Sequence, residues 1–156
     1  MPFETVKIDP RPMLYVTRSA GMAPDEISGV MGEAFGAIGG FIGRAGVTPA
    51  GPPLAVYRDW DEGTGRMQID VGFPVDEADT DKAEGKVKSG ETPSGNALRA
   101  VHRGPYMTLR ETYGDMQAHI KKVGMTVPAL AWEVYITDPD KTPEHELLTE
   151  VYMPMP

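Results

Sequence analysis

The sequence predicts an α+β fold. We expect two pseudo-symmetric βαββ repeats that form one curved antiparallel sheet, with two helices on one face and a ligand cleft on the other. One supporting observation is that aligning Gly46 with Gly124 also aligns Tyr57 with Tyr135 without a gap. The second is that each aligned segment follows a strand-like run and a helix-like stretch, and precedes a polar turn and one more strand-like run.

The first repeat begins with a strand-like run over residues 13–18, which follows two prolines. We expect a helix over 25–44, because its apolar residues recur at the spacing of one buried helix face. Gly46 suits the end of this helix, since glycine readily ends helices in the left-handed conformation. Two further strands are expected over 54–59 and 67–75.

The expected first helix also carries a stripe of glycines. They are Gly29, Gly32, Gly36, Gly40 and Gly43. Each glycine inside a helix costs roughly 1 kcal/mol relative to alanine. We therefore expect another element, such as the sheet, the second helix or another subunit, to approach this backbone closely.

The second repeat has the same order of elements. Strands are expected over 97–102, 132–138 and 147–155, and a helix over 107–123. Apolar residues at helical spacing indicate this helix, and two lysines near its end complement the helix dipole.

The chain is expected to be a single domain over residues 1–156. Within it, repeat one covers 1–75 and repeat two covers 96–156. The connection over 76–95 is rich in charged and small residues, which is typical of a solvated linker with room for a short strand near 86–88.

Charge and composition exclude several kinds of partner. The net charge is −8, and no cluster of Lys and Arg offsets it locally, so we expect no nucleic-acid partner. The longest apolar stretch is short and interrupted by a glutamate, so we expect no membrane partner. Without a recognisable signal peptide, the chain is expected to be cytoplasmic, as a monomer or homodimer.

The sequence gives no reason to expect a metal or a cofactor. It contains no cysteine, which excludes disulfides, thiolate metal sites and a cysteine nucleophile. The histidines His102, His119 and His145 have no metal-ligand spacing with one another or with carboxylates. Phosphate-loop, dinucleotide and nucleophile-elbow motifs do not occur.

Glu133 is the most informative candidate residue, because it interrupts an otherwise apolar strand-like run. Its repeat-mate is Ala55, so the repeat itself does not require an acid at this position. A partly buried carboxylate is costly unless it is paired or hydrogen-bonded. Spacing alone leaves two alternatives open: the floor of a ligand pocket, or a solvent-facing glutamate on an open sheet.

Strand alternation assigns side chains near Glu133 to two faces. Trp132, Val134 and Ile136 share one face, and we expect these large apolar residues to face the helices. Glu133 and Tyr135 should then line the opposite, concave face.

Aromatic residues accompany the carboxylate, as expected for a site that binds flat or cationic organic ligands. Tyr57 and Tyr135 are repeat-mates, and other aromatic residues lie at strand ends or junctions. Phe73 and Tyr113 are interpreted as ordinary core residues. The candidate ligand-binding residues are Glu133, Tyr135, Tyr57, Tyr106, Tyr15 and Trp60.

Motifs in both halves resemble the GyrI-like small-molecule-binding family, also called the AraC-type effector-binding domain. The second half carries the run His-Arg-Gly-Pro-Tyr over 102–106 and the run Glu-Val-Tyr-Ile-Thr-Asp-Pro over 133–139. The first half matches through 49–53 and Tyr57. The likeness covers nearly the whole chain. It implies two modules with a ligand cleft between them and a glutamate, here Glu133, at the pocket floor.

The resemblance also implies a function. With no room for a helix-turn-helix extension, the chain is similar to stand-alone members, and we expect a binding protein for hydrophobic, aromatic or cationic organic compounds, linked to toxin or drug resistance. One alternative is a hydrolase of cyclopropanoid genotoxins, with Glu133 and Tyr106 as catalytic groups. A further alternative is a protein-interaction role like that of the gyrase inhibitors.

Overall fold

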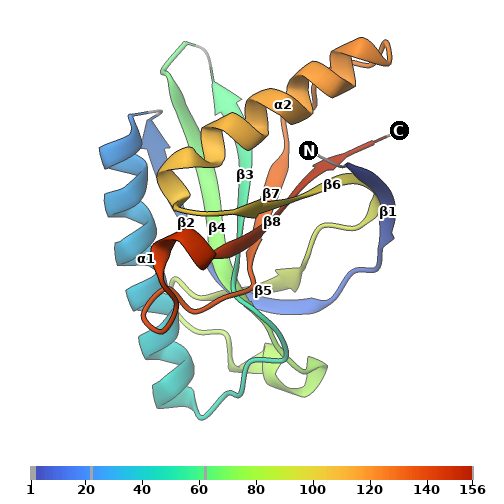
Figure 1. Cartoon of the computed structure of the whole chain (residues 1–156). Helices are drawn as coiled ribbons and strands as arrows, with labels where there is room; N and C mark the ends of the chain where they lie inside the picture. The colour runs from blue at the N-terminus through green and yellow to red at the C-terminus, as the bar shows by residue number, and fades with distance from the viewer. Residues whose placement is uncertain (1–2, 22, 62, 156) are drawn as a thin grey trace.

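The structure, a computed structural model, describes residues 3–21, 23–61 and 63–155, without the side chains of Pro24, Trp60 and Asp61. Within these residues it contains a single antiparallel sheet and two α-helices, α1 (Pro24–Ala45) and α2 (Leu109–Lys122) (Figure 1). The predicted α+β fold class is confirmed.

Eight strands form the curved sheet. In chain order they are β1 (Glu4–Ile8), β2 (Pro12–Gly21), β3 (Leu54–Asp61), β4 (Arg66–Pro74), β5 (Lys88–Glu91), β6 (Gly95–Arg103), β7 (Ala131–Tyr135) and β8 (Leu148–Pro154). Across the sheet the order is β1-β6-β8-β7-β3-β4-β2-β5. Three 3₁₀ turns lie in the connections: η1 (Glu77–Lys82), η2 (Tyr106–Thr108) and η3 (Glu144–Glu146).

The two repeats meet in the middle of the sheet, where β3 pairs with β7. Ala55 lies directly opposite Glu133 in this pair. These two residues are also repeat-mates in the sequence alignment, so the pseudo-twofold axis passes between them. A side chain beside this axis lies close to both halves of the molecule.

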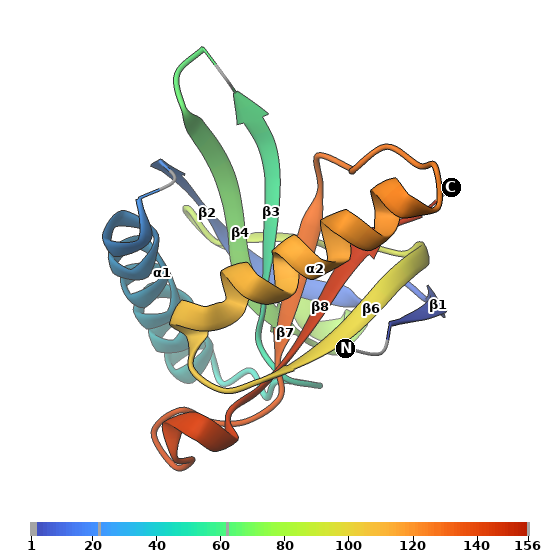
Figure 2. The ribbon, with the colours of Figure 1, turned by 45° about the horizontal axis from the view of Figure 1, so that its top comes forward.

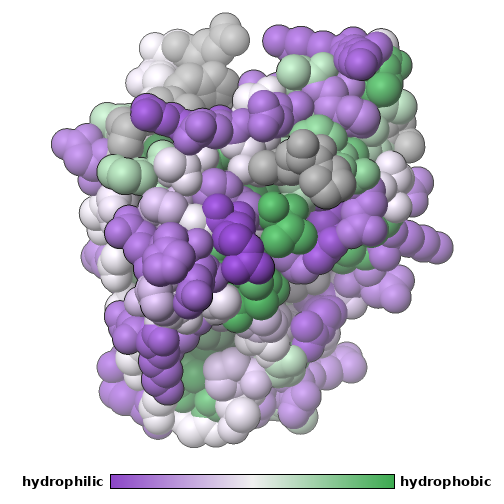
Figure 3. All heavy atoms as spheres, viewed as in Figure 1, coloured by the Kyte–Doolittle hydropathy of each residue, from purple (hydrophilic) through white to green (hydrophobic). Residues whose placement is uncertain are grey.

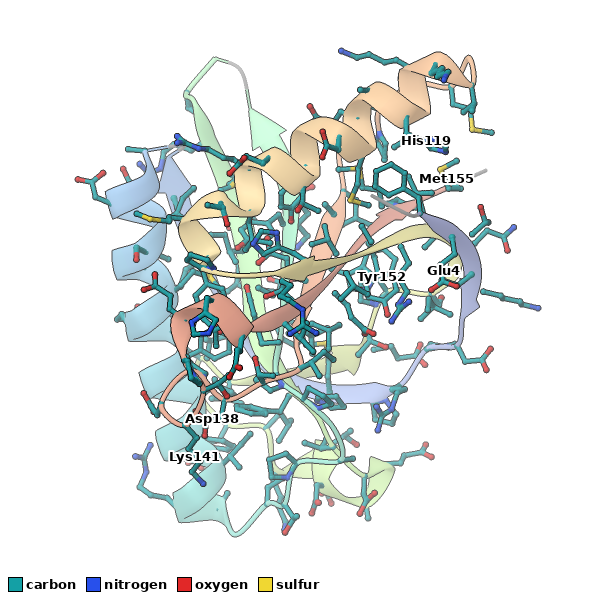
Figure 4. The ribbon with its side chains drawn as sticks, viewed as in Figure 1. Glu4, His119, Asp138, Lys141, Tyr152 and Met155 are labelled. Carbon is teal, nitrogen blue, oxygen red and sulfur yellow. The ribbon has the colours of Figure 1, made fainter. Side chains whose placement is uncertain are left out.

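The pairing of the edge strands was not predicted from the sequence. β1 lies at the start of the first repeat but pairs with β6 of the second, so that Glu4 lies opposite Arg99. β5 lies in the connection expected to be a linker and pairs with β2 of the first repeat. Arg99 forms ion pairs with Glu4 and with Glu150, which ties β1, β6 and β8 together. Glu4, the first residue of β1, is labelled in Figure 4.

Both helices cover the same face of the sheet (Figures 1 and 2). α1 packs on β2 and β4 through its buried residues Ala34, Ile38 and Ile42. α2 packs on β6 through a second apolar stripe that includes Met116 and Ile120. Each stripe follows the helical period seen in the sequence, and together they form the core on this face.

The opposite face carries a core of its own, and this overturns the predicted orientation of β7. Trp132 is buried there and stacks on Tyr152, with ring centroids 5.2 Å apart. Val134 packs against the same cluster. Ile136 lies beyond the end of β7 and is 42% exposed. Because apolar residues cover both faces of the sheet, the bulkier set did not have to face the helices.

The glycine stripe on α1 is not packed closely, contrary to expectation. A Cβ atom built on Gly29, Gly32, Gly36 or Gly43 would meet nothing within 4 Å. Gly72 on β4 is the opposite case. A Cβ there would lie 2.1 Å from the Leu14 carbonyl oxygen, so β2 could not pair as closely with β4.

The side seen in Figure 3 is mostly hydrophilic, with hydrophobic atoms gathered in small areas between polar ones. Among the described helices, none is long and apolar enough to cross a membrane.

Candidate ligand-binding site

Three tyrosines enclose the carboxylate of Glu133, which is 4% exposed. The phenol of Tyr113 donates a hydrogen bond of 2.6 Å to Oε2. The phenol of Tyr135 donates one of 2.6 Å to Oε1, and that of Tyr57 donates a longer one of 3.4 Å to the same oxygen. We call Glu133, Tyr57, Tyr113 and Tyr135 the Glu133 cluster.

The cluster draws on three elements of the fold. Glu133 and Tyr135 are two residues apart on β7, so strand alternation places them on one face. Tyr57 comes from the neighbouring strand β3, and Tyr113 from the first turns of α2. The strands form the floor of the site, and α2 supplies its cover.

Helix α1 and turn η2 flank the cluster on its outer side. The ring of Tyr135 packs edge-on against Phe35 of α1, with centroids 5.6 Å apart, and against Tyr106 of η2 at 5.7 Å. Such perpendicular contacts are the favoured geometry for aromatic pairs. The phenol of Tyr57 also lies 4.0 Å from the sulfur of Met31 on α1. The cluster is thus closed between α1 and α2.

The carboxylate of the cluster is surrounded by neutral groups. Burial raises the pKa of Glu133, and the three phenol hydrogen bonds oppose that rise. Burial also raises the pKa of each of the three phenols, and the Glu133 carboxylate adds to that rise. Among the described residues, no Lys or Arg forms an ion pair with Glu133. The carboxylate is therefore solvated by neutral donors alone.

The cluster lies on the helix-covered face, so the expected placement of Glu133 and Tyr135 on the opposite face is wrong. The opposite face has a separate hollow of about 100 Å³, lined by residues that include Leu54, Trp132 and Tyr152. None of the Glu133 cluster lines this hollow. The helices, expected to cover only the core, in fact cover the candidate site.

The predicted site residues do not all come together. Tyr57 and Tyr135 bond to Glu133 as described. Tyr106 is 37% exposed and contacts the cluster through the ring of Tyr135, and no hydrogen bond joins it to Glu133 in the described structure. Tyr15 packs with the apolar cluster on the opposite face, where its ring covers Gly90.

Trp60, also among the predicted site residues, has a backbone within β3, but its side chain lies outside the described part of the chain.

Tyr113 is the site residue that sequence reasoning missed, because its helical spacing matched an ordinary core stripe. One signal was available. A tyrosine on a buried helix face needs a hydrogen-bond partner for its phenol, whereas phenylalanine does not. That requirement points across the interface to a polar group on the sheet, which here is Glu133.

A second polar network holds the β6–α2 junction beside the cluster. His102 is buried, and its Nδ1 lies 2.7 Å from the Thr112 hydroxyl of α2. Its Nε2 lies 3.1 Å from the Pro105 carbonyl oxygen. Since a carbonyl can only accept, we assign the ring hydrogen to Nε2, and Thr112 then donates to Nδ1. This network fixes where α2 begins, and therefore where Tyr113 lies.

Among the described residues, no group of three or more His, Cys, Asp or Glu side chains is arranged to hold a metal ion.

The fold and the site together define a pseudo-symmetric small-molecule-binding domain, in which two βαββ modules share a carboxylate enclosed by tyrosines. The family comparison agrees. The family model described as the GyrI-like small molecule binding domain matches residues 1–156. The chain belongs to this GyrI-like family. A search of curated protein sequences gave no significant match.

Several solved structures share the fold. EcmrR, in an EcmrR–DNA complex, matches with a TM-score of 0.82 and 20% identity over 98% of this chain. SAV2435 bound to tetraphenylphosphonium matches with a TM-score of 0.72 and 15% identity over 99% of this chain and 93% of its own. A Listeria innocua hydrolase encoded by lin2189 matches with a TM-score of 0.60 and 16% identity, over 97% of this chain and 90% of its own.

The EcmrR comparison corrects the expectation that nucleic acid is not among the partners. This chain spans 56% of the EcmrR chain, which is found in a complex with DNA. The fold therefore occurs within a DNA-bound protein. The acidic net charge of −8 describes this domain alone, and says nothing about the assemblies in which such a domain occurs.

Proposed function

We propose that this chain binds aromatic or lipophilic organic cations at the Glu133 cluster. One observation carries the proposal: a buried carboxylate is solvated only by three neutral phenols, with no basic residue paired to it among the described residues. A buried carboxylate without a cationic partner is costly. A ligand that supplies the missing positive charge would remove part of that cost.

The aromatic rings suit such a ligand. The faces of tyrosine and phenylalanine rings attract organic cations, and this attraction is stronger where water is excluded. Because the phenols close over the carboxylate, a ligand has to displace at least one of them. Tyr113 and the Phe35 and Tyr106 rings lie on α2, α1 and η2, so these elements would move as the ligand enters.

The proposal is also supported by SAV2435, which shares the fold and was solved bound to tetraphenylphosphonium. This ligand is a lipophilic aromatic cation. By extension, we propose that the present chain accepts several cations of this kind, as a multidrug-binding protein would. The hydrolase alternative has less support, because Tyr106 reaches Glu133 only through the Tyr135 ring.

The test is calorimetric titration of tetraphenylphosphonium into the wild type and the Glu133→Gln variant. Glutamine keeps the size of the side chain and one acceptor oxygen, but it removes the charge and replaces the other oxygen with a donor amide. We expect the variant to bind about tenfold to hundredfold more weakly, as for loss of a buried charge-assisted interaction.

Tyr15→Phe is the matched control, because it removes a phenol on the opposite face of the sheet. Its affinity should stay within about twofold of the wild type. Equal affinity of the wild type and Glu133→Gln for the cation would contradict the proposal.

A further inference from the structure

A fully buried hydroxyl beside the Glu133 cluster has no partner. Thr149 of β8 is 0% exposed, and its Oγ1 forms no hydrogen bond within the described part of the chain. An unsatisfied buried hydroxyl destabilises the fold, whereas a valine of almost the same shape would not. Such a group needs an explanation, and a binding site is one place where it has a use.

The strand register places Thr149 on the floor of the site. Thr149 lies directly opposite Tyr135 on β7 and opposite His102 on β6. Directly opposite residues of an antiparallel pair share a face, so Thr149 faces the helices. Glu133 precedes Tyr135 by two residues and is a diagonal neighbour of Thr149, about 7–8 Å away. One small ligand can therefore contact both residues.

The polar side chains on either side of Thr149 are already committed. Tyr135 donates its phenol hydrogen to Glu133 at 2.6 Å. Both ring nitrogens of His102 are engaged, Nδ1 by Thr112 and Nε2 by the Pro105 carbonyl. Neither neighbour forms a hydrogen bond with the Thr149 hydroxyl.

We propose that Thr149 is a second polar contact of the ligand site, and that the preferred ligands are protonated amines carrying a hydroxyl or carbonyl oxygen on the second carbon from the nitrogen. The inference rests on the proposed function and adds the ligand class. The ammonium group pairs with Glu133, and the oxygen exchanges a hydrogen bond with Thr149. A purely lipophilic cation leaves the hydroxyl unsatisfied, and sites built to hydrogen-bond a ligand discriminate strongly against analogues that cannot do so.

The experiment uses a matched pair of cations, propranolol and its deoxy analogue, which differ only in the hydroxyl group beside the amine. Both are titrated calorimetrically into the wild type, Thr149→Val and Thr149→Ser. In the wild type we expect propranolol to bind about tenfold more tightly than the deoxy compound. Thr149→Val should abolish this ratio without weakening the deoxy compound, and Thr149→Ser should retain most of it.

An equal ratio in the wild type and Thr149→Val would overturn the inference while leaving the cation site intact. A wild type that binds neither cation would overturn the proposed function together with the inference. Thermal melting gives an independent readout. Without ligand, Thr149→Val should melt at a higher temperature than the wild type, because it removes an unsatisfied hydroxyl. A lower melting temperature would show that the hydroxyl has a partner within the fold.

Discussion

At the scale of single residues, Glu133 couples the binding site to pH. Burial raises the pKa of Glu133 above its ordinary value, so the folded chain holds the proton more tightly than the unfolded chain does. The stability that comes from this residue is complete below the unfolded pKa of about 4.3 and is lost as pH rises through the folded pKa. The ionised cluster is thus the less stable form in the absence of a cation.

Comparison of the wild type with Glu133→Gln tests whether the pKa of Glu133 is raised in the folded state. Glutamine does not titrate, so the free energy of unfolding of the variant relative to the wild type should rise from pH 4 upward and level off above the folded pKa. The rise should amount to about 1.4 kcal/mol for each pH unit that separates the unfolded from the folded pKa. Urea unfolding across pH 4–8 measures it. A difference that stays constant with pH, or falls, would show that the pKa is not raised.

The sequence identified the centre of the site but not all of its surroundings. Glu133 stood out because its repeat-mate is alanine, and Tyr57 and Tyr135 were located by the same repeat alignment. Tyr113 was hidden, since periodicity shows which helix face is buried but not which polar group it meets. Thr149 was missed for a similar reason. A sequence does not show whether a buried hydroxyl lacks a hydrogen-bond partner, because that depends on which groups its neighbours already bind.

At the scale of elements, α1 combines a well-packed stripe with an exposed row of glycines. Ala34, Ile38 and Ile42 hold it on the sheet, while the Cβ positions of Gly29 and Gly36 open into free space. Glycine destabilises a helix interior because it loses more backbone freedom on folding. The helix that contributes Phe35 beside the site is therefore held mainly by its packed stripe.

Gly36→Ala should raise the free energy of unfolding by about 0.5–1 kcal/mol, because alanine fits the helix and the open space. Gly46→Ala is the matched control with the opposite sign. Gly46 ends α1 with φ 70°, where a Cβ is strained, so the same change should destabilise by about 1 kcal/mol. Thermal or urea unfolding of both variants checks the pair, and destabilisation by Gly36→Ala would mean that the stripe is packed after all.

The orientation of β7 shows where element-level prediction failed. Strand alternation correctly placed Trp132 and Val134 on one face of the sheet and Glu133 and Tyr135 on the other. It does not show which of the two faces meets the helices. The faces were assigned by side-chain size, on the assumption that the sheet has a single apolar face and that this face meets the helices. Here the helix-free face buries Trp132 against Tyr152, and so both faces are apolar.

At the scale of the whole molecule, the repeat predicted the order of strands and helices, and the pairing of the edge strands was missed. β1 and β5 are short and mostly exposed, so they carry little apolar signal. Their pairing nevertheless links the halves, because β1 of the first half completes the second half and β5 completes the first. The boundaries drawn at 1–75 and 96–156 therefore cut through the pairing of both edge strands.

Because the edge strands link the two halves, we predict that the molecule unfolds in one step. Differential scanning calorimetry should show a single transition with a ratio of van't Hoff to calorimetric enthalpy of about 1. Fragments 1–75 and 96–156 should each lack a cooperative transition, because each is missing an edge strand and the central β3–β7 partner. Two resolved transitions in the full chain would indicate independent halves.

The position of Ala55 opposite Glu133 has a consequence for how such a molecule can be built by duplication. A perfectly repeated sequence would place two identical side chains face to face at this point. Two glutamates there would repel each other in a dry interior, and two alanines would offer a ligand no charge at all. The halves differ at this position, so the symmetric scaffold hosts a single acidic centre, and under the proposed function this centre pairs with one positive charge at a time.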